Sequence, residues 1–214
     1  DTYYDAFSKV NMTIAIALAS KDPAQLTDKD RQDIQAFISQ ALQNSKIATE
    51  QAGPLNVANW LTRAQIYQNL VNVAQNAYEW SISAYNTAIQ LDPVNPQLRL
   101  NLGGVYFAAG DYLSAANQFR QAITLKQGYA NARYNFALSL VALGELEQAK
   151  SELEITRLLL PEDSEDRKIL DQEIQNLAAS IKTTQEQATK PTVEELTGVT
   201  PAQEQQQEPL TNVT

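Results

Sequence analysis

The sequence predicts an all-α fold, in which antiparallel helix hairpins stack into a right-handed superhelix with a C-terminal capping helix and a low-complexity tail. Hydrophobic residues make up 43% of the 214 residues, with only 7 Gly and 8 Pro. Long stretches rich in Ala, Leu, Gln and Asn favour helix over strand. A pattern of large, small and turn residues recurs after about 34 residues, which is typical of stacked helical repeats.

Residues 1–52 are expected to form an N-terminal helical hairpin. Apolar residues at helical spacing predict its first helix, namely Tyr3, Tyr4, Phe7, Val10, Ile14 and Leu18. Thr27 followed by Asp30 resembles a capping box that opens the second helix. The apolar face of that helix is Ile34, Phe37, Ile38, Ala41, Leu42 and Ile47. Because this pair matches the repeat pattern poorly, it is interpreted as a divergent repeat or an N-terminal cap.

Three copies of one repeat unit are predicted between residues 53 and 161. One copy has large, small and turn residues at Leu102, Gly103, Tyr106, Gly110, Ala115, Phe119, Ala122 and Gln127. About 34 residues later the same classes recur at Phe136, Ala137, Leu140, Gly144, Ala149, Leu153, Thr156 and Pro161. Gly103 is expected to let the second helix of its hairpin approach closely. Gly110 and Gly144 are expected to end the first helices.

The first unit is irregular, because its second-helix pattern arrives about five residues late against the repeat period. A longer first helix or a bulged loop around residues 73–78 would accommodate the extra chain. Trp60 is expected to pack in the core, whereas Trp80 should be more open.

Two segments of different composition follow the repeats. Ser164 opens a predicted capping helix over residues 162–182, whose apolar face is Ile169, Leu170, Ile174, Leu177 and Ile181. Residues 183–214 are mostly Gln, Glu, Thr and Pro, a composition typical of a disordered tail.

The repeat resembles a known family. The stretch NLGGVYFAAGDYLSAANQFRQAI is similar to the tetratricopeptide-repeat (TPR) consensus, and YNFALSLVALGELEQAKSELEI matches it less fully. Departures are Gln127 for the terminal proline, Arg99 for an early aromatic residue and Thr156 for an alanine. The resemblance implies a superhelix whose first helices line a concave groove that holds extended peptide.

The resemblance also implies which side chains point into that groove. The groove residues expected to bind peptide are Gln97, Leu100, Asn101, Phe107, Asn131, Tyr134, Asn135 and Leu138. The other groove positions are Gly104, Ala108, Val141 and Ala142, and in the first unit Ala58, Leu61, Thr62, Gln65, Gln68 and Asn69. Asn101 and Asn135 occupy equivalent positions, so their amides could form a ladder for a peptide backbone. The alternative is that they are solvated residues of a helix surface.

Family members that bind chaperone tails use a clamp of Lys and Asn side chains. The clamp positions in this sequence include Leu61, Gln65 and Tyr134. The clamp is therefore absent, and recognition of an acidic C-terminal tail is disfavoured. Phe107 and Tyr134 are the expected anchors of a neutral, partly apolar groove.

Composition argues against enzymatic chemistry. The chain has no His and no Cys, which excludes Ser–His–Asp triads, Cys–His pairs and zinc sites with the usual ligands. We therefore expect no catalytic residues, no cofactor and no metal. The formal net charge of −9 disfavours nucleic acid as a partner, and no apolar run is long enough to span a membrane.

Self-association is expected through the tail or the ends of the superhelix. The apolar residues of the tail are Val193, Leu196, Val199, Leu210 and Val213. They are expected to dock on a neighbouring copy or to fold back across the groove. A contact between copies that does not close would give a filament, so an extracellular homopolymer is the alternative function.

A second resemblance concerns location. The run NVANWLTRAQIYQNL, followed by EWSISAYNTAIQLDPVNPQLRLNLGGVYFAAGDY, is similar to the soluble C-terminal region of O-antigen-ligase-like, multi-pass membrane proteins of uncultured bacteria. That likeness covers roughly residues 1–180 and implies an extracytoplasmic location, with a membrane part upstream of Asp1. It also implies a further alternative, an accessory domain of a membrane glycan-assembly enzyme.

Overall fold

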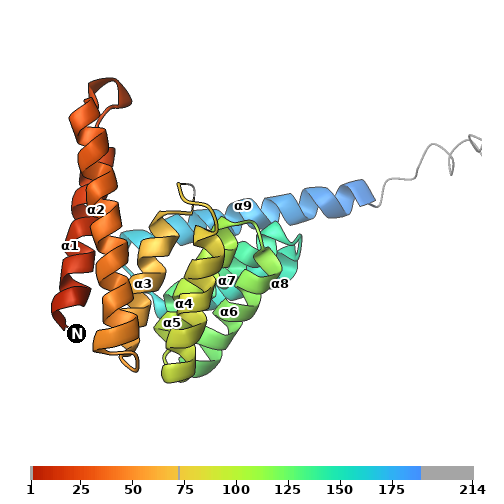
Figure 1. Cartoon of the computed structure of the whole chain (residues 1–214). Helices are drawn as coiled ribbons and strands as arrows, with labels where there is room; N and C mark the ends of the chain where they lie inside the picture. Colours follow the sequence, from red (N-terminus) through yellow and green to blue (C-terminus); the bar gives the residue numbers. More distant parts are fainter. Residues whose placement is uncertain (1, 72, 189–214) are drawn as a thin grey trace, which may run out of the picture.

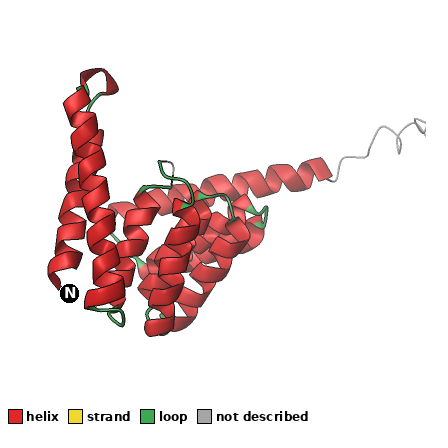
Figure 2. Ribbon diagram, viewed as in Figure 1, coloured by secondary structure: helices red, strands yellow, loops and turns green. Residues whose placement is uncertain are grey.

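The computed structural model describes residues 2–71 and 73–188, and within these residues it contains helices and no strand (Figure 2). The α-helices are α1 (Thr2–Ala19), α2 (Asp28–Ile47), α3 (Val57–Asn69), α4 (Ala77–Leu91), α5 (Pro96–Ala108), α6 (Tyr112–Leu125), α7 (Ala130–Ala142), α8 (Leu146–Leu159) and α9 (Glu165–Ala188). A 3-10 turn (Pro23–Gln25) precedes α2 and a π-helical turn (Ala48–Ala52) follows it. The predicted all-α fold is confirmed.

The helices pack as successive antiparallel hairpins. The pairs are α1 with α2, α3 with α4, α5 with α6, and α7 with α8. Each hairpin packs against the next along the chain (Figure 1). The last helix, α9, packs on α8, and its C-terminal part projects beyond the stack as a single helix. This is the expected superhelix of hairpins.

Glycines close the hairpins in the way the sequence predicts. Gly110 and Gly144 have positive φ angles of 80° and 82°, which residues with a Cβ rarely adopt. After Gly110, the amide of Asp111 donates to the Tyr106 carbonyl at 3.0 Å, which satisfies an orphan carbonyl of α5. The Asp111 carboxylate then accepts from the Ser114 amide and caps α6.

Gly103 marks a close approach between α5 and α6. A Cβ built on Gly103 would lie 2.5 Å from Cε1 of Phe119, which is well inside van der Waals contact. Phe119 is buried and belongs to the core cluster formed by α5, α6, α7 and α8. The predicted role of Gly103 in close packing is therefore confirmed.

The extra residues of the first unit form a loop and not a longer helix. α3 ends at Asn69 and α4 begins at Ala77, so the connection spans residues 70–76. Asn76 adopts a left-handed φ of 61° at the start of α4. Trp60 is partly buried against the α3–α5 core, while Trp80 is 48% exposed.

The capping box at the start of α2 is also present. The Thr27 hydroxyl accepts from the Asp30 amide at 3.1 Å, and the Asp30 carboxylate accepts from the Thr27 amide at 3.0 Å. Lys21 pairs with the same carboxylate at 2.8 Å. These bonds join the connection between α1 and α2 to the first turn of α2.

The C-terminal boundary differs from the sequence prediction. The last helix was expected to end at Lys182, but residues 183–188 continue α9. In this extension the Thr183 and Thr184 hydroxyls donate to the carbonyls of Ala179 and Ser180, one turn earlier. The predicted docking residues Val193, Leu196, Val199, Leu210 and Val213 lie outside the described residues.

Candidate functional site

The first helices of the hairpins lie beside one another in the stack. α1 contacts α3, and α5 contacts α7. Side chains of α3 and α5 share one core cluster. α7 and α9 are joined by a hydrogen bond from the Tyr134 hydroxyl to Glu173. The predicted groove positions lie on α3, α5 and α7. We call the surface formed by their side chains the first-helix face.

Two amide pairs recur on this face at the repeat interval. Pro96 and Ala130 begin α5 and α7 34 residues apart, so Asn101 and Asn135 are each the sixth residue of their helix. Gln97 Nε2 donates to Asn101 Oδ1 at 2.7 Å, and Asn135 Nδ2 donates to Asn131 Oδ1 at 2.6 Å. The structure therefore brings these four predicted residues together as two equivalent pairs.

Each pair leaves polar atoms available. Asn101 Nδ2 and Asn135 Oδ1 form no hydrogen bond within the described part of the chain. Both residues are half-buried. One repeat thus presents a donor and the next presents an acceptor, and these are the two groups that a peptide backbone complements.

The apolar residues predicted for the groove differ in their burial. Leu100 is only 8% exposed and packs in the core cluster with Phe119 and Phe136, so it is a core residue and not an open groove residue. Phe107 is half-buried and its ring lies against Tyr112 of α6, with centroids 5.2 Å apart. Leu138 is half-buried as well.

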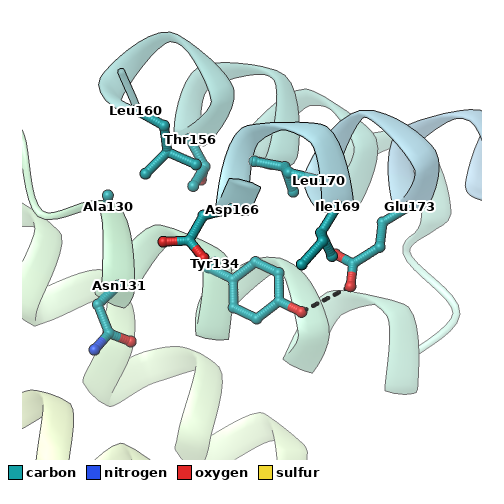
Figure 3. A pocket seen from close by; sticks show the side chains of 9 residues that line it. All are labelled: Ala130, Asn131, Tyr134, Thr156, Leu160, Asp166, Ile169, Leu170 and Glu173. Atoms are coloured by element: carbon teal, nitrogen blue, oxygen red, sulfur yellow. Dashed lines mark hydrogen bonds between the residues drawn. The ribbon is translucent and has the colours of Figure 1, made fainter. Parts of the chain in front are cut away.

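A pocket of about 490 Å³ lies between α7 and α9, and we call it the α7–α9 pocket (Figure 3). Its lining comes from the start of α7, the end of α8 and the start of α9: Ala130, Asn131, Tyr134, Thr156, Leu160, Asp166, Ile169, Leu170 and Glu173. Asn131 and Tyr134 were predicted as groove residues. Asp166 and Glu173 were not among the groove residues predicted from the sequence.

The pocket carries two carboxylates beside a protonated phenol. The Tyr134 hydroxyl donates to Glu173 Oε1 at 3.0 Å. Burial raises the pKa of Tyr134, and the hydrogen bond to Glu173 and its negative charge raise it further. Tyr134 therefore stays protonated at neutral pH. In the view of Figure 3, the Asp166 carboxylate lies on one side of the Tyr134 ring and Glu173 on the other.

Neighbouring basic side chains do not neutralise these carboxylates, because they are engaged elsewhere. On α7 and α8, Arg133 pairs with Glu152, Lys150 with Glu154 and Arg157 with Asp171. On α9, Lys168 pairs with Glu165 and Lys182 with Glu186, while Arg167 donates to the Leu160 carbonyl. Within residues 2–71 and 73–188, neither Asp166 nor Glu173 has a cationic partner.

Helix spacing explains why α9 contributes to this pocket. Asn131 and Tyr134 are the second and fifth residues of α7, and Asp166 and Ile169 are the second and fifth residues of α9. Glu173 is the ninth residue of α9, which is also a groove position in the repeat pattern. α9 therefore occupies the place of a further first helix. The signal was present in the sequence, but residues 162–182 were interpreted only as a cap.

A smaller pocket of about 150 Å³ lies between α1 and α3. Its lining residues are Lys9, Met12, Thr13, Ile16, Thr62, Gln65, Ile66 and Asn69. Thr62, Gln65 and Asn69 are groove positions predicted for the first unit. α1 therefore stands beside α3 in the way that α9 stands beside α7, so pockets lie at both ends of the first-helix face.

Comparison with known families agrees with the geometry. A family model described as TPR repeat matches residues 71–110, and a second described as tetratricopeptide repeat matches residues 106–170. The chain is a tetratricopeptide-repeat protein. The matches extend from the α3–α4 connection into the beginning of α9, so they include the first turns of α9 that line the pocket.

Two curated relatives each match 91 residues of the TPR protein. One is the tetratricopeptide repeat and J domain-containing co-chaperone DNJ1 of Cryptococcus neoformans, 31% identical over 91 residues. The other is the human RNA polymerase II-associated protein 3, 30% identical over 91 residues. The matched segment is 42% of this chain but only 17% and 14% of those two proteins.

Solved structures show the same fold at low sequence identity. MamA is 19% identical, with a TM-score of 0.53 over 77% of this chain and 99% of that one. A thermophilic TPR protein of Thermus thermophilus is 16% identical, with a TM-score of 0.54 over 80% of this chain and 99% of that one. PilF of Pseudomonas aeruginosa is 15% identical, with a TM-score of 0.54 over 84% of this chain and 71% of that one.

Two features of the described residues concern metal binding and membrane insertion. Among residues 2–71 and 73–188, no cluster of three or more acidic side chains is arranged to hold a metal ion. No helix in the same part of the chain is both long and apolar enough to cross a membrane.

Proposed function

We propose that this TPR protein is a non-enzymatic scaffold that binds an extended polypeptide along its first-helix face. The observation that carries the proposal is the repeated amide pair, Gln97–Asn101 and Asn131–Asn135. Each pair leaves a hydrogen-bonding atom of an Asn side chain unused. A peptide backbone offers a donor and an acceptor at every residue, so it can bond to both repeats without regard to its sequence.

Shape and family membership support the same proposal. Pockets lie at both ends of the first-helix face, where side chains of a bound peptide could be held. The name of one relative describes a co-chaperone and that of the other a polymerase-associated protein, and both names describe proteins that act with other proteins. The two carboxylates of the α7–α9 pocket disfavour an acidic peptide, in agreement with the absence of a Lys–Asn clamp.

Selection from a library of 12-residue peptides on the immobilised full chain tests this proposal. Asn101→Ala combined with Asn135→Ala should weaken the selected peptides about tenfold, because two hydrogen bonds of about 0.5–1.5 kcal/mol each are lost. Asn86→Ala on α4 is the matched control, since Asn86 is exposed on a second helix. Equal affinity of the double variant and the control variant would refute binding on this face.

Self-association at the ends of the stack is a second proposed function, supported by exposed apolar surface. On α1, Tyr3, Phe7 and Val10 lie on one face and are 65%, 43% and 55% exposed. At the other end, Ile155 and Leu158 of α8 are exposed. Contact between the two ends is heterologous, so it would repeat head to tail and build a filament. The proposed extracellular filament rests on this surface and on docking by the tail.

Light scattering and negative-stain imaging at micromolar concentration test self-association. Val10→Lys should reduce the assembled fraction, because it places a charge in the α1 face. Leu113→Lys, at an exposed apolar position of α6, is the control. A chain shortened after Ala188 separates docking by the tail from docking by the ends. Particles that remain monomeric at every concentration would contradict this function.

An extracytoplasmic location and the role of accessory domain in a glycan-assembly enzyme stay proposals. They rest on the resemblance to the soluble region of O-antigen-ligase-like proteins. Locating the tagged full-length protein by cell fractionation would test both.

A further inference from the structure

We infer that the α7–α9 pocket is a subsite for one Lys or Arg side chain of the bound peptide. The inference rests on the proposed function and deepens it, because it names the chemistry of the partner. The pocket adjoins the amide pairs: Asn131 belongs to the second pair and also lines the pocket. A peptide that bonds to Asn101 and Asn135 therefore reaches the pocket as it continues towards α9.

The hydrogen-bonding atoms of the pocket mainly accept. Asp166 and Glu173 carry carboxylates, which accept hydrogen bonds and do not donate them. The Tyr134 proton is already donated to Glu173, so the phenolic oxygen has only lone pairs left to offer. The Thr156 hydroxyl is also committed, since it donates to the Glu152 carbonyl at 2.8 Å. A ligand group rich in N–H donors complements this set.

Charge selects a cation among such donors. Asp166 and Glu173 contribute two negative charges that no Lys or Arg of the described chain neutralises. Asp166 lies in the first turn of α9, where a carboxylate also favours the helix dipole. Glu173 lies two turns further along and has no such role, so its charge is available to a ligand.

The remaining lining suits the stem of a long basic side chain. Leu160, Ile169 and Leu170 provide apolar surface on α8 and α9. Lys and Arg carry methylene stems that pack on apolar surface while the charged end stays among polar groups. An Arg guanidinium has five N–H donors, enough to bond to a carboxylate and to the Tyr134 oxygen together.

A metal ion does not fit the same residues. Asp166 and Glu173 are seven residues apart on one helix, a rise of about 10 Å. Calcium needs six to eight oxygen ligands at about 2.3–2.6 Å, which two carboxylates at that spacing cannot supply. The pocket therefore suits the long cationic side chain of Lys or Arg and not a metal ion.

Matched peptides and matched variants test the inference. Each selected peptide that contains Lys or Arg is compared with a copy that carries norleucine at that position. Asp166→Asn combined with Glu173→Gln removes both charges, and the amide that replaces the Glu173 carboxylate can still accept from Tyr134. Glu162→Gln combined with Asp163→Asn is the control, because it removes two exposed charges near the pocket that do not line it and that pair with no basic side chain of the described residues.

We expect the cationic peptide to bind the native chain about two- to fivefold more tightly than the norleucine copy, as for a partly exposed charge pair. The pocket variant should abolish that preference and the control should keep it. Peptides that bind with equal affinity whether they carry Lys or norleucine would overturn the subsite and leave the proposed function standing. If no peptide from the library binds, the proposed function fails and the subsite fails with it.

Discussion

The hydroxyl of Tyr134 on α7 donates to the carboxylate of Glu173 on α9 at 3.0 Å. This bond joins the last repeat hairpin to the helix that follows it. Beside it, Ala137 of α7, Leu153 of α8 and Leu170 of α9 form a small buried cluster. α9 therefore closes the stack and at the same time forms one wall of the α7–α9 pocket.

Tyr134→Phe should loosen α9. The substitution removes one hydrogen bond to a charged acceptor, which contributes about 1.5–3 kcal/mol when buried and less at this half-buried site. We expect the free energy of unfolding to fall by about 1 kcal/mol and hydrogen exchange in α9 to speed up.

Tyr112→Phe is the control for that experiment. Tyr112 is a half-buried aromatic residue that packs against Phe107. Its hydroxyl is not part of the α7–α9 contact, so its loss should leave exchange in α9 unchanged. Equal exchange rates in α9 for Tyr134→Phe and the native chain would show that the bond does not hold the helix.

Gly103→Ala should destabilise the α5–α6 hairpin, whereas Gly104→Ala should not. A Cβ at Gly103 would lie 2.5 Å from the buried Phe119 ring, but a Cβ at Gly104 meets nothing within 4 Å. Overpacking of this kind costs about 1–3 kcal/mol. Alanine at an open helical position is about 0.5–1 kcal/mol more favourable than glycine. Urea unfolding of the two variants should therefore move in opposite directions, and a shift in the same direction would contradict the close packing at Gly103.

The fold was predictable because each hairpin carries its own local signals. Gly110 and Gly144 mark turns that need a positive φ. Between these turns, apolar residues recur at the spacing of a helix. The extra residues before Ala77 were visible as a shift in the repeat, although the pattern alone did not distinguish a loop from a longer helix. Local sequence decides these features, so they need no tertiary information.

The site was less predictable because it depends on packing between units. Leu100 stands at a groove position in the pattern, but the neighbouring α6 and α7 cover it. Asp166 and Glu173 look like ordinary surface acids until α9 is placed beside α7. The spacing of residues along α9 indicates which of its side chains would face the groove, but only the docking of α9 on the last hairpin shows that the helix lies beside α7.

Tyr85→Phe should make the stability of the protein less sensitive to alkaline pH. Tyr85 is buried between α3, α4 and α5, its hydroxyl donates to Gln68 at 2.9 Å, and burial raises its pKa well above the ordinary value of 10.0. Above pH 10 the unfolded chain loses this proton and the folded chain keeps it. Stability contributed by neutral Tyr85 is thus complete below pH 10 and is lost as the pH rises through the folded pKa.

Urea unfolding between pH 8 and pH 11 measures the effect. Tyr85→Phe should lower stability by about 1 kcal/mol at pH 8, because the hydrogen bond is lost. Its stability should then fall less steeply above pH 10 than that of the native chain. Tyr3→Phe, which alters an exposed ring, is the control. Parallel pH curves for Tyr85→Phe and the native chain would contradict the burial of this hydroxyl.

Asp30→Asn should remove part of the acid sensitivity of the N-terminal hairpin. The ion pair with Lys21 and the bonds from the Thr27 hydroxyl and amide hold the pKa of Asp30 well below its ordinary value of 3.8. Because the folded pKa is depressed, the stabilising contribution is present above pH 3.8 and is lost as the pH falls through the folded pKa. Asp28→Asn is the control, since Asp28 is an exposed acid in the same first turn of α2. Circular dichroism of thermal unfolding between pH 2 and pH 6 should show a flatter acid limb for Asp30→Asn than for Asp28→Asn, and the reverse order would exclude Asp30 as the group that titrates.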